Sequence, residues 1–156
     1  MELNRLMFRE YDIRGIWNED ITEEISYHIG RAYATKLLSY GKNKMIVGYD
    51  NRLSSPIIEE NLVKGLTERG VNVVRLGLVT TPMYYYAWDK LNIHAGIMIT
   101  ASHNPKEYNG FKMSYNGIHN MFGKDVSDLY YVIINGIYSE GNGTIEYADI
   151  KEDYVK

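Results

Sequence analysis

The 156-residue sequence contains no cysteine, only three prolines, and no apolar run near the roughly 20 residues that cross a bilayer. The lack of cysteine excludes disulfides and thiolate metal sites and favours a reducing compartment. Residues 1–8 also lack the apolar stretch of a secretory leader. We therefore expect a cytoplasmic protein that does not enter a membrane.

The sequence also lacks a large excess of charge of either sign. The formal net charge is −3, and Lys and Arg are scattered, so no basic stripe points to a nucleic-acid partner. Apolar residues make up 45% of the chain, which is enough for the core of one compact domain. A length of 156 residues is too short for two domains. We expect one domain over residues 1–145, with the mostly charged residues 146–156 starting a linker to an absent second domain.

The spacing of apolar residues alternates between helical and strand periods along the chain. Helices are expected over 22–40, 55–69 and 81–91, and strands over 45–49, 71–76 and 95–100. This alternation predicts a mainly parallel sheet with helices on both faces. Ser55 and Thr81 are the expected N-caps of the second and third helices, because a proline follows each of them.

A further strand is expected over 110–115. The loop before it is too short for a parallel crossover, so this strand should pair antiparallel with a neighbour. Apolar residues at helical spacing predict a last helix over 126–137, and glycines recur over 136–143.

The segment 100–105 (TASHNP) follows a buried strand, and ligand sites of open α/β sheets lie beyond the carboxyl ends of strands. The hydroxyl of Ser102, beside the imidazole of His103, is suited to holding a covalent phosphate. The alternative is a plain Asn-Pro turn with Ser102 as a local cap. A serine hydrolase is disfavoured, because the pattern Gly-x-Ser-x-Gly is absent.

Two basic residues are candidates for the same site. Arg14, in the polar run 8–15 (FREYDIRG), offers a planar fork of donors for a phosphate, or it pairs with Glu10 or Asp12 on a solvated surface. Lys112 follows the Ser102 loop closely enough for a hairpin to return its ammonium, or it is merely solvated.

Other polar segments carry less information. The loop 50–54 (DNRLS) ends a strand and is interpreted as a capping turn. The tyrosines at 84–86 are interpreted as packing residues. The histidines lack metal-ligand spacing, and we assign no chemistry to His28, His94 or His119.

Taken together, five segments resemble the α-D-phosphohexomutase superfamily, and particularly its phosphomannomutase/phosphoglucomutase branch. They are 8–15 (FREYDIRG), 47–56 (VGYDNRLSSP), 81–87 (TPMYYYA), 96–105 (GIMITASHNP) and 108–112 (YNGFK). The resemblance implies the first of four domains, a three-layer α/β/α sandwich with a mixed, mainly parallel four-stranded sheet. The sequence departs from the family pattern at Tyr49, Asn51 and Ser55, so loop 50–54 is left out of the catalytic assignment.

The resemblance also implies roles for single residues. Ser102 is the phosphorylated residue, and its phosphate is one ligand of Mg²⁺, whose other ligands lie outside this chain. Arg14 and Lys112 match the basic pair that assists acid–base chemistry. His103 matches the histidine beside the phosphoserine, and Tyr11 matches an aromatic that binds substrate.

The implied reaction interconverts hexose 1-phosphate and hexose 6-phosphate, with mannose or glucose as the sugar, through a 1,6-bisphosphate. Glucose 1,6-bisphosphate is the implied activator, and the partners are sugar phosphates and the protein's own missing domains. The isolated domain should therefore be inactive. The alternative is a non-catalytic phosphate- or nucleotide-binding flavodoxin-like module, which would carry a Gly-rich loop after its first strand, where this chain has Asp50-Asn51-Arg52.

Overall fold

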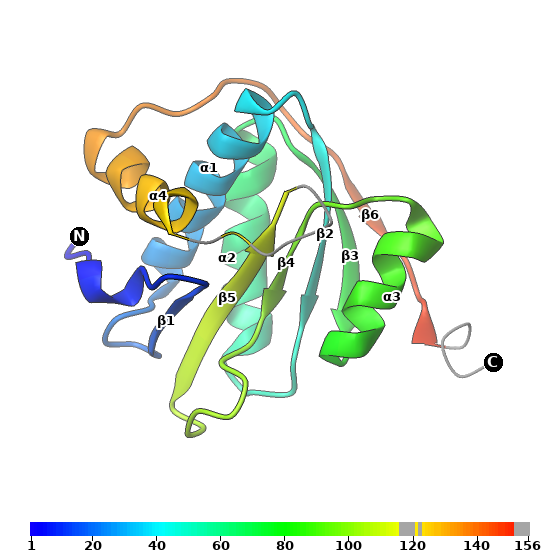
Figure 1. Cartoon of the computed structure of the whole chain (residues 1–156), viewed down its shortest axis with the longest axis horizontal. Helices are drawn as coiled ribbons and strands as arrows, with labels where there is room; N and C mark the ends of the chain where they lie inside the picture. Colours follow the sequence, from blue (N-terminus) through cyan, green and yellow to red (C-terminus); the bar gives the residue numbers. More distant parts are fainter. Residues whose placement is uncertain (116–120, 122, 152–156) are drawn as a thin grey trace.

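The computed structural model describes residues 1–115, 121 and 123–151 of the chain. One mixed sheet lies between two helical layers (Figure 1), which confirms the predicted α/β/α class. The strands are β1 (Ile13–Ile16), β2 (Lys44–Tyr49), β3 (Asn72–Leu78), β4 (Gly96–Ile99), β5 (Tyr108–Ser114) and β6 (Ile145–Tyr147). The helices are the 3₁₀ turn η1 (Arg5–Met7), α1 (Glu23–Ser39), α2 (Ser55–Glu68), α3 (Thr81–Leu91) and α4 (Lys124–Asn135).

The strand order is β1-β5-β4-β2-β3-β6. Strands β4, β2, β3 and β6 are parallel, whereas β5 is antiparallel to both β4 and β1. The antiparallel pairing expected for the strand near 110–115 is therefore confirmed, with Ile99 opposite Phe111. This arrangement brings the chain back past the end of β4 immediately after the Ser102 loop.

The sheet has six strands rather than the four that we expected. Both additional strands lie at edges. Strand β1 is short and carries Arg14 and Gly15, so it has no strand-like apolar run, and β6 has only exposed residues. Tyr147 pairs with Arg75 on β3, and Ile150 is buried, so these two residues of the expected linker pack against the domain. Residue 146, where we expected a linker to start, lies within β6.

Side chains alternate between the two faces of the sheet, as the pleat requires. On β2, Met45 and Val47 pack with α1, α2 and α4, whereas Ile46 packs with α3. Helices α1 and α2 approach each other closely at two glycines. A Cβ at Gly30 would lie 2.3 Å from the carbonyl oxygen of Leu62, so only glycine permits this contact.

The helix starts differ from the prediction by one residue. Thr80, rather than Thr81, caps α3 by accepting a hydrogen bond from the amide of Met83 at 3.2 Å. Ser55 is not a cap, because its hydroxyl donates to Asp50 instead. No helix among the described residues is both long and apolar enough to cross a membrane.

Candidate functional site

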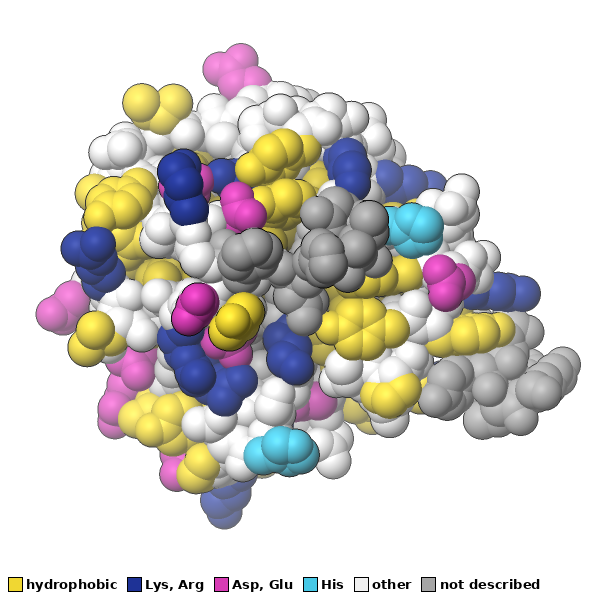
Figure 2. All heavy atoms as spheres, viewed as in Figure 1, with side chains coloured by type: hydrophobic (Ala, Val, Ile, Leu, Met, Phe, Trp, Pro, Cys, Tyr) yellow, Lys and Arg dark blue, Asp and Glu magenta, His cyan; other side chains and the backbone are white. Residues whose placement is uncertain are grey.

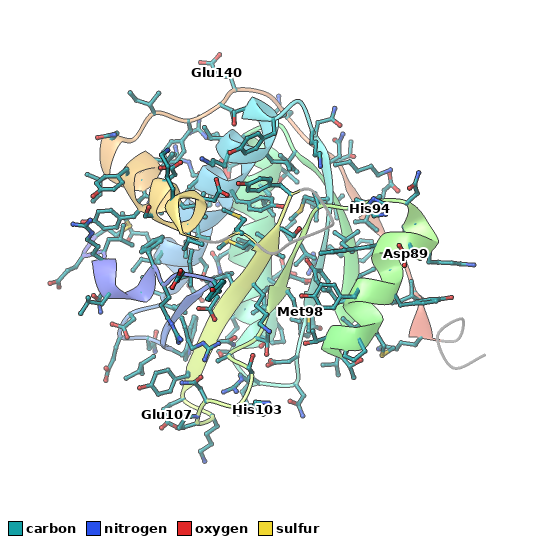
Figure 3. All side chains as sticks on the ribbon, in the orientation of Figure 1. Asp89, His94, Met98, His103, Glu107 and Glu140 are labelled. Carbon is teal, nitrogen blue, oxygen red and sulfur yellow. The ribbon has the colours of Figure 1, made fainter. Side chains whose placement is uncertain are left out.

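A cleft of about 550 Å³ opens at the carboxyl ends of β2 and β4. Figure 3 shows His103 and Glu107 at this end of the sheet and His94 toward the opposite end. The lining residues come from three segments of the chain: Trp17, Asp50, Asn51, Arg52, Leu53, Ser54, Ser102, Asn104, Lys106 and Glu107. The loop that contains Ser102 thus forms one wall of the cleft, as the position of its strand predicted.

Ser102 has a strained backbone and an exposed side chain. Its φ is 54°, in the left-handed region that costs a non-glycine residue on the order of 1 kcal/mol. The amide of Ser102 donates to the Thr100 hydroxyl at 3.0 Å, and the amide of Asn104 donates to the Ala101 carbonyl at 3.1 Å. Both bonds turn the chain sharply after β4, so the hydroxyl of Ser102 reaches the cleft.

Arg14, on β1, forms a hydrogen bond with the Ser102 loop. Its Nε and Nη2 donate to Asp12 Oδ2 at 3.1 and 2.6 Å, and its Nη1 donates to the side-chain oxygen of Asn104. Asp12 is only 4% exposed. Of the two interpretations of Arg14, the ion pair with Asp12 is present, and it orients the guanidinium toward the Ser102 loop rather than into solvent. Within the described residues, two N–H groups of Arg14 stay uncommitted.

Arg52 has more contacts with the Ser102 loop than any residue that the sequence singled out. It donates to the main-chain carbonyls of Ser102, Asn104, Pro105 and Tyr108 at 2.7–3.0 Å. The sequence interpretation of this segment as a capping turn missed that role. The available signal was its position at the carboxyl end of β2, next to the end of β4.

A second group of polar side chains lies beneath the loop. Asp50 Oδ1 accepts from the Arg52 amide at 3.1 Å and from the Ser55 hydroxyl at 2.8 Å. Buried Asn109 donates to the hydroxyls of Ser54 and Ser55 at 2.8 and 3.0 Å. This network connects β2, α2 and β5 below the cleft, and none of it was predicted.

The other predicted site residues, although the structure describes them, are not among those that line the cleft. Lys112, on β5, lies opposite Met98 of β4 and is half-buried. Since Ile13 and Phe111 both face the core of α1 and α2, alternation puts Arg14 and Lys112 together on the other face of the sheet. His103 is exposed beside Ser102, and Tyr11 is 64% exposed.

The structure describes two of the histidines to which we assigned no chemistry, and the tyrosines at 84–86 pack in or against the core, as interpreted. Burial and the nearby Arg31 lower the pKa of His28. His94 lies 3.8 Å from the Asp89 carboxylate, far from the cleft (Figure 3). His119 lies outside the described residues. Tyr84 is buried in the core below α3.

The surface charge shown in Figure 2 is mixed, with Lys and Arg dispersed among Asp and Glu on this face. The described residues contain no group of three or more His, Cys, Asp or Glu side chains that could hold a metal ion. Besides the ion pair of Arg52 and Asp50, the cleft is lined by the charged side chains of Lys106 and Glu107.

These features define a class of protein: a three-layer α/β/α domain that presents a strained serine at the carboxyl edge of its sheet. The sequence matches the family model "Phosphoglucomutase/phosphomannomutase, alpha/beta/alpha domain I" over residues 5–130. The chain belongs to the phosphoglucomutase/phosphomannomutase family and corresponds to domain I.

Individual relatives agree with this assignment. The chain is 40% identical to a phosphoglucomutase of Neisseria meningitidis serogroup B, covering 97% of this chain and 33% of the relative. It is 39% identical to the phosphomannomutase/phosphoglucomutase of a Pseudomonas aeruginosa strain, over 96% of this chain and 32% of the relative. The chain thus spans about a third of the length of these relatives.

The fold is also found in solved structures. A phosphoglucomutase/phosphomannomutase family protein from Burkholderia thailandensis superposes with a TM-score of 0.92 at 32% identity, covering 99% of this chain and 35% of that one. A putative phosphomannomutase from Thermus thermophilus gives a TM-score of 0.79 at 28% identity, over 94% and 34% of the two chains.

Proposed function

We propose that this chain is the phosphoserine-bearing domain of a mutase that interconverts hexose 1-phosphates and hexose 6-phosphates of glucose or mannose. The observation that carries the proposal is the exposed Ser102 hydroxyl in a strained turn at the carboxyl end of β4, inside the cleft. Strained residues concentrate at functional sites, and an exposed hydroxyl is free to accept a phosphoryl group. The family of the relatives supports the same activity.

The transfer step is a displacement at phosphorus. The bond between phosphorus and the Ser102 oxygen breaks, a bond to a sugar hydroxyl forms, and the hydroxyl proton passes to the serine oxygen. The resulting 1,6-bisphosphate reorients and returns its other phosphoryl group to Ser102. Positioning and charge stabilisation supply most of the rate in such transfers.

Arg14 and Lys112 are the basic groups that would stabilise the transferring charge. They share one face of the sheet on adjacent strands, and Arg14 retains N–H groups beyond its bonds to Asp12 and Asn104. His103 is exposed beside Ser102, and the exposed Tyr11 would contact the sugar.

Magnesium fits this chain only in part. Mg²⁺ prefers an octahedron of oxygen ligands, and the described residues offer no carboxylate cluster for it. The Ser102 phosphate would supply one ligand, and the others would come from outside this chain. When bound, the ion would neutralise charge on the phosphoryl group.

The proposal includes inactivity of the domain alone. The chain corresponds to a third of its relatives, so groups that bind the sugar and complete the metal site would be missing. We expect the chain to convert no glucose 1-phosphate to glucose 6-phosphate by itself, which a coupled assay of glucose 6-phosphate measures.

The test is phosphorylation of Ser102. The chain is mixed with glucose 1,6-bisphosphate and a catalytic trace of a full-length relative, and intact mass and peptide mapping follow. We expect one phosphoryl group on Ser102 in the wild type and in Ser127→Ala, a serine of α4 that is remote from the cleft, and none in Ser102→Ala.

Two results would contradict the proposal. Tight binding of the bisphosphate without any covalent phosphate would favour the flavodoxin-like binding module. An unmodified Ser102 in the complete, active native protein would exclude the mechanism, since turnover would then proceed without a phosphoserine.

A further inference from the structure

We infer that Arg52 is a positioning residue that holds the Ser102 loop in its left-handed turn and does not itself contact the phosphate. The inference rests on the proposed role of Ser102. Arg52 lines the cleft, so its charge alone would suggest a phosphate-binding residue. Its hydrogen bonds indicate otherwise.

Every donor of Arg52 is already used. A guanidinium has five N–H groups in one plane. Nε donates to Asp50 Oδ2 at 3.3 Å. Nη1 donates to the carbonyls of Pro105 and Tyr108 at 2.7 and 3.0 Å, and Nη2 donates to those of Ser102 and Asn104 at 3.0 and 2.9 Å. Five donors meet five acceptors, so a phosphate could bind Arg52 only by breaking the loop's own bonds.

The acceptors also matter for Ser102. Four carbonyl oxygens of the Ser102 loop and the start of β5 accept from one cation, so its charge compensates their negative ends. A phosphate on Ser102 would be repelled by carbonyl oxygens that faced it. Because the carbonyl of Ser102 itself is held, the bond also restrains the residue whose φ is 54°.

Arg52 is itself held in place by hydrogen bonds to Asp50. Its side chain is only 11% exposed, and Asp50 accepts both from its Nε and from its main-chain amide. The hydroxyl of Ser55 holds Asp50, and buried Asn109 holds Ser55. The strained turn is therefore connected through Arg52 to strands β2 and β5 and to the start of α2.

Lysine distinguishes the two roles. A lysine at position 52 keeps the positive charge but cannot hold four carbonyls in a planar fork. If Arg52 acts by holding the loop, Arg52→Lys and Arg52→Gln should be equally impaired. If it acts by its charge on the phosphate, Arg52→Lys should keep much of the rate.

The first measurement is amide hydrogen exchange of the unphosphorylated chain, followed by mass spectrometry of peptides that cover residues 100–110. We expect exchange there to become about tenfold faster or more in both Arg52 variants, since the four hydrogen bonds that hold the loop are lost. The matched control is Arg75→Gln, because Arg75 is equally buried, with 13% of its side chain exposed, and lies away from the cleft. It should leave this segment unchanged.

The second measurement is the rate of Ser102 phosphorylation as a function of glucose 1,6-bisphosphate concentration. Both Arg52 variants should lower the rate at saturation by roughly 100-fold, with little change in the half-saturating concentration, because a misplaced nucleophile slows transfer without weakening binding. Arg75→Gln should retain the wild-type rate at a temperature where it is folded.

Other results would overturn the inference. Unchanged exchange over residues 100–110 in Arg52→Gln would show that Arg52 does not hold the loop. A raised half-saturating concentration, rescued by lysine, would make Arg52 a phosphate ligand. If Ser102 also stays unmodified in the complete, active native protein, the proposed function fails, and the exchange experiment still decides whether Arg52 holds the loop.

Discussion

Two arginines of similar burial lie in different parts of the sheet and do different work. Arg52, at the cleft, donates to one carboxylate and four main-chain carbonyls. Arg75, on β3, donates to the carboxylates of Glu59 and Glu60 and to the hydroxyl of Tyr147. One arginine holds a loop in a strained conformation, and the other joins α2 to the edge of the sheet.

The difference shows what a buried cation contributes in each place. At the Arg75 edge the partners are charged, so each charge neutralises the other, and removing either partner leaves a buried charge. Glu59 is only 2% exposed, and this burial raises the pKa of its carboxyl even though Arg75 opposes the shift. At the cleft the partners are mostly neutral carbonyls, so the charge of Arg52 fixes the main-chain conformation of the Ser102 loop. Changes at the cleft should therefore affect transfer, and changes at the Arg75 edge should affect stability.

The largest effect is expected at the cleft from Arg14. We expect Arg14→Gln to slow phosphorylation of Ser102 by roughly 100- to 1000-fold, because it removes charge stabilisation of the transferring group. The rate is followed by intact mass under saturating bisphosphate. Arg5→Gln, in the remote turn η1, is the control and should keep the wild-type rate. A rate for Arg14→Gln near that of the wild type would remove Arg14 from the site.

The next largest effect is a loss of stability, expected from a change of Arg75 on β3. Arg75→Gln should lower the free energy of unfolding by about 3 kcal/mol at neutral pH, since it leaves the Glu59 carboxylate buried without its cation. Urea unfolding measures this, and Ser102 phosphorylation at low temperature should be unaffected. A normal stability would mean that the pair contributes little, and a slowed transfer would break the separation between the two edges.

The stability loss of Arg75→Gln should also depend on pH. Burial raises the pKa of Glu59 above its ordinary value of 4.5, and loss of Arg75 raises it further. A carboxyl with a raised folded-state pKa binds more protons in the folded state, so stability is lost as pH rises through that pKa. The gap in the free energy of unfolding between wild type and Arg75→Gln should therefore be small near pH 4.5 and grow as the pH rises through the raised pKa of Glu59. The double variant Glu59→Gln/Arg75→Gln should lose this dependence.

The sequence was informative where local pattern and structure coincide. Alternating helical and strand periods predicted the layers, and the short loop after β4 predicted an antiparallel neighbour. Ser102 was found because it follows a buried strand. Strand β6 escaped prediction, because its three exposed residues are too few to show a strand period and are held by pairing with β3.

The network around Ser102 could not be predicted for a different reason. Arg52 binds main-chain carbonyls, which every residue has, so no partner residue in the sequence indicates the contact. The bond from Arg14 to Asn104 joins residues 90 positions apart that only the sheet order brings together. Asn109 is buried among hydroxyls of α2, although its neighbours in sequence suggest only a turn.

The smallest effect is expected from the strain in the Ser102 turn. Ser102→Gly removes the Cβ that disfavours a φ of 54°, so it should raise the free energy of unfolding by about 1 kcal/mol while abolishing phosphorylation. Asn92→Gly is the control, because Asn92 has a φ of 53° at the end of α3, remote from the cleft. Asparagine tolerates this region better than serine, so Asn92→Gly should gain less and keep the full phosphorylation rate. A Ser102→Gly variant no more stable than the wild type in urea would mean that the bonds from Arg52 and Thr100 already offset the strain.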